Sequence, residues 1–254
     1  MNYILEKIAA LQWDYEPSFV PECIHFVQKE DLIMIKNLRS TSVHANRVVR
    51  YNKPVENIEM VFDYFEGRPF SWWVIENKEL ESKLSEHGMT HHDTYIGLAR
   101  TLEDVNVTPE RYRIENVTTK EDVCLHAKLS AEIWGYDEKN LEAAINERES
   151  YLNLPDRRGG FVLAFDEDTP VGYSSYRYSH DGDALYMTGA GVLQSHRGKG
   201  VYRKMVENRL VDAKEKGSSI AVTQARYGTS EPILRKLGFQ EHGVFKQYIP
   251  DEKA

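Results

Sequence analysis

A glycine-rich connection between an apolar run and an amphipathic segment constrains the fold of this chain more than any other feature. The apolar run covers residues 184–193, and the segment from Val201 to Lys216 carries apolar residues at spacings of three and four, which predicts a buried strand followed by a helix. Between them stands Arg197-Gly198-Lys199-Gly200. The first N–H groups of a helix have no partner inside the helix and lie at its positive end. Glycines let a ligand approach the backbone there, so the loop is a candidate site for a diphosphate.

Two familiar phosphate-binding motifs do not fit this loop. A P-loop requires Ser or Thr after Gly-Lys, but Gly200 follows Lys199. A Rossmann fingerprint requires a third glycine three residues after the second, and none stands near Lys204. A glycine turn that merely starts a helix is the remaining structural alternative.

The arrangement that fits is Arg-x-x-Gly-x-Gly/Ala, with Arg197, Gly200 and the position of Tyr202. With Val192 five residues before Arg197, this stretch resembles the GNAT superfamily of acyl-CoA-dependent N-acyltransferases. The sequence departs from the family at Tyr202, where Gly or Ala is usual and where a ring could crowd the pyrophosphate.

A second motif of that family follows in the expected order. Residues 219–225 predict a strand, and Ser230, Pro232 and Gly238 frame a short helix ending in Leu237-Gly238-Phe239. Residues 243–249 predict the last strand. The family often places a tyrosine four residues before this glycine as the acid for the departing thiolate, and this chain has Leu234 there.

The first part of the chain repeats the ending of the second. Residues 84–89 align with residues 234–239, each with a short helix, a glycine stop and a strand, which suggests two related halves. The first half has no counterpart of the glycine loop, so we expect it to bind no coenzyme. It resembles the degenerate N-terminal half of tandem GNAT proteins, also in its Pro69–Val74 phrase. An unrelated cap whose Trp72 and Trp73 are core residues is the alternative.

The resemblance implies an α/β fold, with a mixed, mostly antiparallel sheet flanked by helices, preceded by a smaller degenerate GNAT-like α/β half. We expect a GNAT-like N-terminal domain at residues 1–107 and the acyltransferase domain at residues 108–254, joined by a polar connection at 102–110. The expected elements of the second part are strands at 112–117, 161–165 and 171–178, and helices at 119–133 and 141–152. The first of these helices is expected to start at a cap formed by Thr119 and Asp122.

Composition agrees with such an enzyme without selecting it. The chain has 254 residues, a formal charge of −8 and 41% hydrophobic residues, which is ordinary for a globular protein. The acidic balance argues against nucleic acid as a partner, and no apolar run approaches the length of a membrane span. Cys23 and Cys124 fit reduced thiols, and we expect a cytoplasmic protein without a metal, acting as a monomer or homodimer.

The resemblance also implies the chemistry: an N-acetyltransferase that moves the acetyl group of acetyl-CoA to an amine of a small molecule or peptide. The expected coenzyme contacts are Val192, whose N–H polarises the thioester carbonyl, then Leu193 and Gln194 along the pantetheine arm, and Arg197, Gly198, Lys199, Gly200, Val201 and Tyr202 around the pyrophosphate. Gly189 and Gly191 inside the apolar run indicate a bulge or a close backbone approach. His196 is expected to line the loop rather than to perform chemistry. Tyr227, at the end of the strand after the loop helix, is the candidate acid that replaces the missing tyrosine. The alternative from another class is a non-catalytic acyl-CoA-binding sensor or partner-binding protein.

Overall fold

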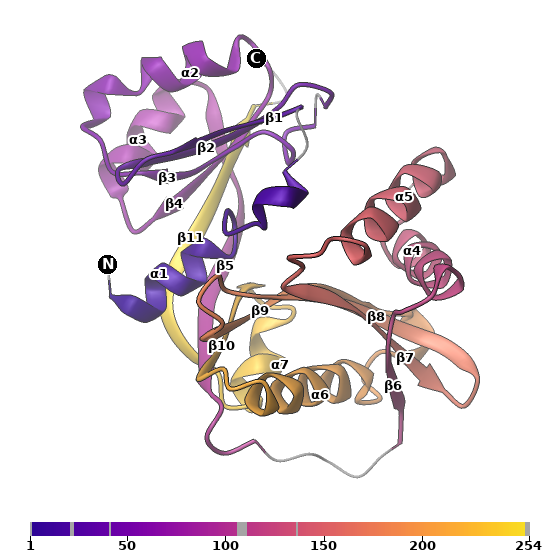
Figure 1. Cartoon of the computed structure of the whole chain (residues 1–254). Helices are drawn as coiled ribbons and strands as arrows, with labels where there is room; N and C mark the ends of the chain where they lie inside the picture. The colour runs from indigo at the N-terminus through magenta and orange to yellow at the C-terminus, as the bar shows by residue number, and fades with distance from the viewer. Residues whose placement is uncertain (1, 21–22, 41, 106–110, 136, 252–254) are drawn as a thin grey trace. The chain divides into compact units, whose positions relative to one another are not determined.

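A computed structural model describes residues 2–20, 23–40, 42–105, 111–135 and 137–251. The chain packs as two compact units, which Figure 1 shows with their elements labelled. Unit 1 contains residues 1–15, 20–98 and 224–254, and unit 2 contains residues 16–19 and 99–223. Each unit is therefore assembled from segments that are far apart in the sequence.

Unit 1 is a sheet with helices, in the strand order β1-β2-β3-β4-β11-β5. Its helices begin with side-chain caps where the sequence offers them: Asn2 accepts the N–H of Leu5 at 2.8 Å, and Asn77 accepts that of Leu80 at 3.0 Å. The elements are β1 (Ile24–Gln28), β2 (Leu32–Asn37), β3 (Arg47–Tyr51), β4 (Ser71–Ile75), β5 (Met89–Thr101), β11 (Gln240–Pro250), α1 (Tyr3–Ala10), η2 (Val55–Asn57), α2 (Glu59–Phe65), α3 (Lys78–Glu86) and α7 (Glu231–Lys236).

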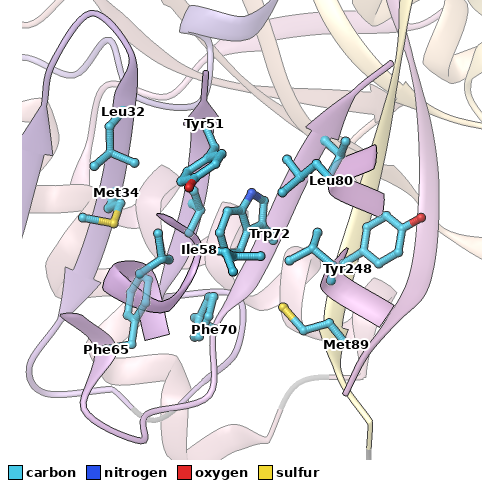
Figure 2. Packing of buried hydrophobic residues seen from close by; sticks show 14 residues of the cluster. Leu32, Met34, Tyr51, Ile58, Phe65, Phe70, Trp72, Leu80, Met89 and Tyr248 are labelled. Carbon is cyan, nitrogen blue, oxygen red and sulfur yellow. The ribbon is translucent and has the colours of Figure 1, made fainter. Parts of the chain in front are cut away.

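An aromatic core holds unit 1 together. Trp72 of β4 is fully buried, with Tyr51 of β3 at a ring-centroid distance of 5.1 Å. Figure 2 shows these rings among residues from β2, α2, α3 and β11. Burying rings of this size dominates the energetics of a core. Trp72 is thus a core residue, whichever origin the first half has.

The last strand of the chain pairs with a strand of the first half. β11 is antiparallel to β4, with Phe245 opposite Ile75 and Tyr248 opposite Trp72, and it lies between β4 and β5. The sequence division into residues 1–107 and 108–254 consequently does not coincide with the compact units. The proposed boundary itself falls among residues 106–110, outside the described part of the chain.

Unit 2 has the strand order β10-β9-β8-β7-β6, with helices on both faces. In Figure 1, α4 and α5 cover one face of these strands and α6 covers the other. The capping box expected at Thr119 and Asp122 is present at the start of α4. The elements are β6 (Arg113–Asn116), β7 (Gly159–Asp166), β8 (Thr169–Tyr178), β9 (Ala184–Val192), β10 (Ile220–Arg226), η1 (Pro17–Phe19), α4 (Lys120–Trp134), η3 (Glu138–Asn140), α5 (Leu141–Leu152), η4 (Gln194–His196) and α6 (Val201–Glu215).

The expected fold class, a mixed and mostly antiparallel sheet flanked by helices, is confirmed. Among the described strands, β3 is parallel to β4, and β9 is parallel to β10. A helix connects each of these pairs, α2 in the first half and α6 in the second. This shared strand–helix–strand unit adds to the repeat seen in the sequence. One detail differs from expectation, because the side chain of Ser230 makes no capping hydrogen bond to α7.

Candidate functional site

β9 and β10 begin as a parallel pair and then separate. Their register runs from Ala184 opposite Ile220 to Tyr186 opposite Val222, and the Thr223 hydroxyl donates to the carbonyl of Met187 at 2.9 Å. β9 continues past the end of this register to Val192. Its last five residues therefore form an edge that lies beyond the paired region.

A β-bulge bends β9 where the two strands part. Between Ser174 opposite Ala190 and Tyr176 opposite Met187, β9 has one residue more than β8, which places the bulge at Thr188 and Gly189. A bulge of this kind bends the strand and increases its twist. A Cβ on Gly189 would meet nothing within 4 Å, so the backbone is open on that side, as expected for this glycine.

Gly191 is a glycine for a different reason. A Cβ there would lie 2.9 Å from Ile133 of α4 and 2.9 Å from Tyr173 of β8. The close packing of α4 on the sheet leaves no room for a side chain. Of the two glycines in β9, one accommodates packing and the other leaves open space.

Hydrogen-bond alternation identifies the amide that faces away from β8. The N–H of Leu193 donates to the carbonyl of Val171 at 2.9 Å. In an antiparallel ladder neighbouring residues point their N–H groups to opposite sides, so the N–H of Val192 is directed toward the side on which β10 has separated. The backbone N–H of Leu193 is therefore used in pairing with β8, and the side chain of Leu193 packs against a core cluster. Gln194 is exposed.

The loop before α6 has the geometry of an anion site. Gly198 and Gly200 have φ angles of 74° and 95°, and a Cβ on either would meet nothing within 4 Å. α6 starts directly at Val201, and the N–H of Lys204 makes the first bond to the Gly200 carbonyl, at 3.0 Å. The N–H groups of the preceding turn therefore point out of the helix end, where an anion is stabilised.

Neighbouring side chains hold this loop in place. The Tyr112 hydroxyl donates to the carbonyl of Lys199 at 3.2 Å, and the Arg197 side chain donates from Nε to the carbonyl of Val192 at 3.2 Å. His196 lies 3.4 Å from the Asp166 carboxylate. Arg197 thus joins the loop to the end of β9, and His196 lines the loop, as expected.

Two of the expected coenzyme contacts, at the start of α6, contribute to the core. Val201 is buried, and the partly buried ring of Tyr202 packs against the same cluster, which includes Tyr112 and Met205. The ring is therefore accommodated by packing under the helix.

The two candidates for the thiolate acid differ in their surroundings. Leu234, which occupies the family's tyrosine position, is 1% exposed and belongs to the core of α7. Tyr227 follows β10 and its side chain is 67% exposed. Its N–H donates to the carbonyl of Thr94 at 2.9 Å, within unit 1. The role of Tyr227 stays a prediction.

A cavity of about 200 Å³ lies in unit 2 next to the bulge in β9. Thr188 contributes the wall formed by the bulge, and the other lining residues come from η1, α5, β7 and β8: Phe19, Glu147, Arg148, Tyr151, Phe161, Ser175, Tyr176 and Arg177. The glycines and the order of the predicted strands indicated the end of β9 as a site. No pattern in the sequence indicated the residues that line this cavity.

A buried carboxylate stands behind one wall of this cavity. Glu16 is fully buried, and its Oε1 accepts from the Tyr151 hydroxyl at 2.7 Å and from the N–H of Arg158 at 2.9 Å. Burial, together with the hydrogen bond to Glu16, raises the pKa of the Tyr151 hydroxyl. Tyr151 therefore stays protonated at neutral pH and is fixed in orientation by Glu16.

Neither a metal site nor a membrane span is found in the described part of the chain. No three His, Cys, Asp or Glu side chains among residues with a defined placement are grouped to hold a metal ion. Within the same residues, every helix is too short or too polar to cross a bilayer.

Residues 125–239, which include β9, the glycine loop and α6, match the model of the Acetyltransferase (GNAT) family. This part of the chain therefore resembles a GNAT acetyltransferase domain. Comparison with curated proteins gave no match.

Solved structures show the same fold over nearly the whole chain. A GCN5-related N-acetyltransferase from Kribbella flavida is 21% identical with a TM-score of 0.68, covering 96% of this chain and 95% of its own. A tandem GNAT protein from the clavulanic acid biosynthesis pathway is 12% identical with a TM-score of 0.62, covering 97% and 93%. A GCN5-related N-acetyltransferase from Sphaerobacter thermophilus is 13% identical with a TM-score of 0.64, covering 87% and 80%. The two-half organisation of the chain fits this fold.

Proposed function

We propose that this protein is an acyl-CoA-dependent N-acyltransferase that transfers acetyl from acetyl-CoA to a primary amine of a small molecule or peptide. The observation that carries the proposal is the separation of β9 from β10 at a bulge, with β9 leading into a glycine loop at the start of α6. The open edge of β9 suits a thioester on an extended arm, and the glycine loop suits a diphosphate.

The residues of the loop fit a diphosphate. The space around Gly198 and Gly200 is open, and the N–H groups at the start of α6 supply donors without a side chain. Lys199 is exposed and adds positive charge. In the proposed complex these groups bind the diphosphate, and acetyl-CoA supplies the activated acyl group.

The Val192 N–H is the proposed donor to the thioester oxygen. Preorganised donors of this kind contribute roughly 3–4 kcal/mol to the transition state in other enzymes. The amine nitrogen forms its bond to the acyl carbon as the carbon–sulfur bond breaks, and a proton from the amine ends on the released thiol. We place the amine in the cavity beside Thr188, because this cavity adjoins the bulge.

Proton transfer to the thiolate is the proposed role of Tyr227. A positioned acid or base contributes roughly 10²- to 10⁴-fold to the rate. The variant Tyr227→Phe is expected to lower kcat by a factor in this range without changing acetyl-CoA affinity. Full activity of the variant removes Tyr227 from the mechanism.

Thermal unfolding with and without acetyl-CoA, followed by thiol release across a panel of amines, tests the proposed function. A ligand at 100 times its dissociation constant adds about 2.7 kcal/mol of stability. A raised melting temperature together with thiol release supports the transferase. An unchanged melting temperature contradicts the assignment of residues 192–202 as the coenzyme site.

The second candidate is a non-catalytic acyl-CoA-binding protein. Leu234 favours it, because this buried side chain offers no proton to a departing thiolate. It predicts the same rise in melting temperature, without thiol release by any amine. For either function we propose a cytoplasmic monomer or homodimer.

A further inference from the structure

The cavity beside Thr188 carries positive charge in an acidic protein. Arg148 and Arg177 line it, against one lining carboxylate, Glu147, which is exposed at the rim. The whole chain has a formal charge of −8. A local excess of positive charge in a recess favours an anionic group of a ligand over a purely cationic one.

Arg148 is oriented by a buried histidine. Its Nε donates to Nδ1 of His126 at 3.1 Å and its Nη1 donates to the carbonyl of Ala144 at 2.9 Å. His126 is fully buried, with Nε2 facing the carbonyl of Ser174 at 3.4 Å. Burial, followed by the nearby charge of Arg148, lowers the pKa of His126 to about 3. A neutral imidazole thus accepts a hydrogen bond from the guanidinium and fixes its orientation beside the cavity.

Arg177 supplies the second guanidinium from β8. Its side chain is almost completely buried, and its Cζ lies 5.9 Å from the centroid of the Tyr186 ring. The Glu16 carboxylate lies behind Tyr151 and is not among the lining groups. Two guanidinium groups and one carboxylate therefore line the cavity.

Aromatic side chains form much of the remaining wall, and the cavity is small. Phe19 meets Tyr151 edge to face at a centroid distance of 5.0 Å, and Tyr151 meets Phe161 at 5.7 Å. The volume of about 200 Å³ equals that of roughly seven water molecules in the liquid. A cavity of this volume fits a compact molecule with an apolar portion.

We propose that the acceptor is a small amine that also carries a carboxylate, of the size and charge of a free amino acid, with the carboxylate bound by Arg148 and Arg177 and the apolar side chain held by the aromatic wall. This inference rests on the proposed function, since it assigns the acceptor of that same site. Guanidinium groups bind carboxylates with short, charge-assisted hydrogen bonds, and the amine is then directed toward Thr188 at the bulge.

Matched pairs of ligands test the proposal. Each L-amino acid of a panel that includes leucine, phenylalanine and methionine is compared with the amine that lacks its carboxylate. Binding is measured by calorimetry on the full chain saturated with CoA, and turnover is measured as thiol release from acetyl-CoA. At least one amino acid is expected to bind and react roughly 10- to 100-fold better than its decarboxylated partner, as for a hydrogen-bonded charge.

Variants then connect the preference to the cavity. Arg148→Gln is expected to lower kcat/KM for the amino acid roughly 10-fold and to leave the decarboxylated amine nearly unchanged, and Arg148→Lys, which keeps the charge, is expected to recover part of the loss. Arg39→Gln, at an exposed site in unit 1, makes the same change in net charge and is expected to have no effect. Melting temperatures verify that each variant is folded.

The outcomes separate this inference from the proposed function. If amines without a carboxylate bind or react as well as the amino acids, the acceptor assignment is wrong and the transferase stands. If no amino acid binds the CoA-saturated protein, the acceptor assignment is equally wrong, whatever acetyl-CoA does to the melting temperature. If acetyl-CoA itself does not bind, the proposed function is wrong, and the acceptor assignment that rests on it is wrong as well.

Discussion

At the scale of single residues, the glycines of the candidate site differ in what they make possible. Gly191 leaves room for α4, whereas Gly198 and Gly200 adopt left-handed torsions beside open space. A side chain at either loop position is strained by its φ angle and also projects into the space that we assign to the diphosphate. The two effects can be separated because Gly217, at the other end of α6, has a φ of 86° and equally open surroundings.

Gly200→Ala and Gly217→Ala form a matched pair for this purpose. Both are expected to destabilise the protein by about 1–2 kcal/mol through the left-handed torsion. Only Gly200→Ala is expected to weaken acetyl-CoA binding, by at least 10-fold, as measured by calorimetry. Equal affinities in the two variants would falsify the assignment of this loop.

His126 makes stability depend on pH. The unfolded chain binds a proton with a pKa near 6.5, whereas folding lowers the pKa of His126 to about 3. The contribution is complete above pH 6.5 and is lost as the pH falls, because the unfolded state takes up the proton first. Between pH 7 and pH 5 this group is expected to remove about 2 kcal/mol from the free energy of unfolding.

Urea denaturation at both pH values measures this loss. The variant His126→Gln keeps a donor and an acceptor but does not titrate, and its loss between pH 7 and 5 is expected to be smaller by about that amount. The exposed His180 gives the control variant His180→Gln. A wild type and a His126→Gln variant with the same pH dependence contradict the assignment of a neutral, buried imidazole.

At the scale of elements, local signals located most helices and strands correctly. The helix expected at residues 141–152 is α5, and α4 begins after the expected cap at Thr119. β2 and β3 were not anticipated, although Leu32-Ile33-Met34-Ile35 is a continuous apolar run typical of a buried strand. The run is evident in the sequence, but its pairing with β1 and β3 is seen only in the structure.

The cap of α4 gives a test at this scale. The Thr119 hydroxyl accepts the N–H of Asp122 at 3.1 Å, and the Asp122 carboxylate accepts the N–H of Thr119 at 2.9 Å. Thr119→Ala is expected to destabilise the protein by about 1 kcal/mol, measured by thermal or urea unfolding. Thr118→Ala, whose hydroxyl lies at the limit of hydrogen-bond distance from Asp122 at 3.5 Å, is expected to cost less. A larger loss for Thr118→Ala contradicts the capping assignment.

At the scale of the whole molecule, the pairing of the last strand, β11, with strands of the first half determines which fragments can fold. β11 lies between β4 and β5, and its Tyr248 belongs to the same core cluster as Trp72. A fragment of residues 1–107 leaves β4 without this neighbour and exposes part of the aromatic core. Such an exposed edge favours aggregation.

We therefore expect the fragment 1–107 to show no cooperative unfolding transition by tryptophan fluorescence. Joining residues 239–251 to it through a flexible linker is expected to restore the transition. The same fusion with Tyr248→Asp, which places an unpaired charge in the core, serves as the control and is expected to stay unfolded. Cooperative unfolding of the fragment without residues 239–251 would show that β11 is dispensable.

The sequence by itself determined the local features of this protein: the amphipathic helix after the glycine loop, the capping box of α4, the bulge-prone glycines of β9 and the family to which they point. Each depends on torsions and contacts within a few residues, and such preferences can be read from spacing. Only the tertiary structure decided that β11 completes the sheet of the first half, and that Arg148 and Arg177 line one cavity with Glu16 behind its Tyr151 wall. Pairings between residues more than a hundred positions apart leave no local pattern, because their energy comes from burial and hydrogen bonds that exist only after the chain has folded.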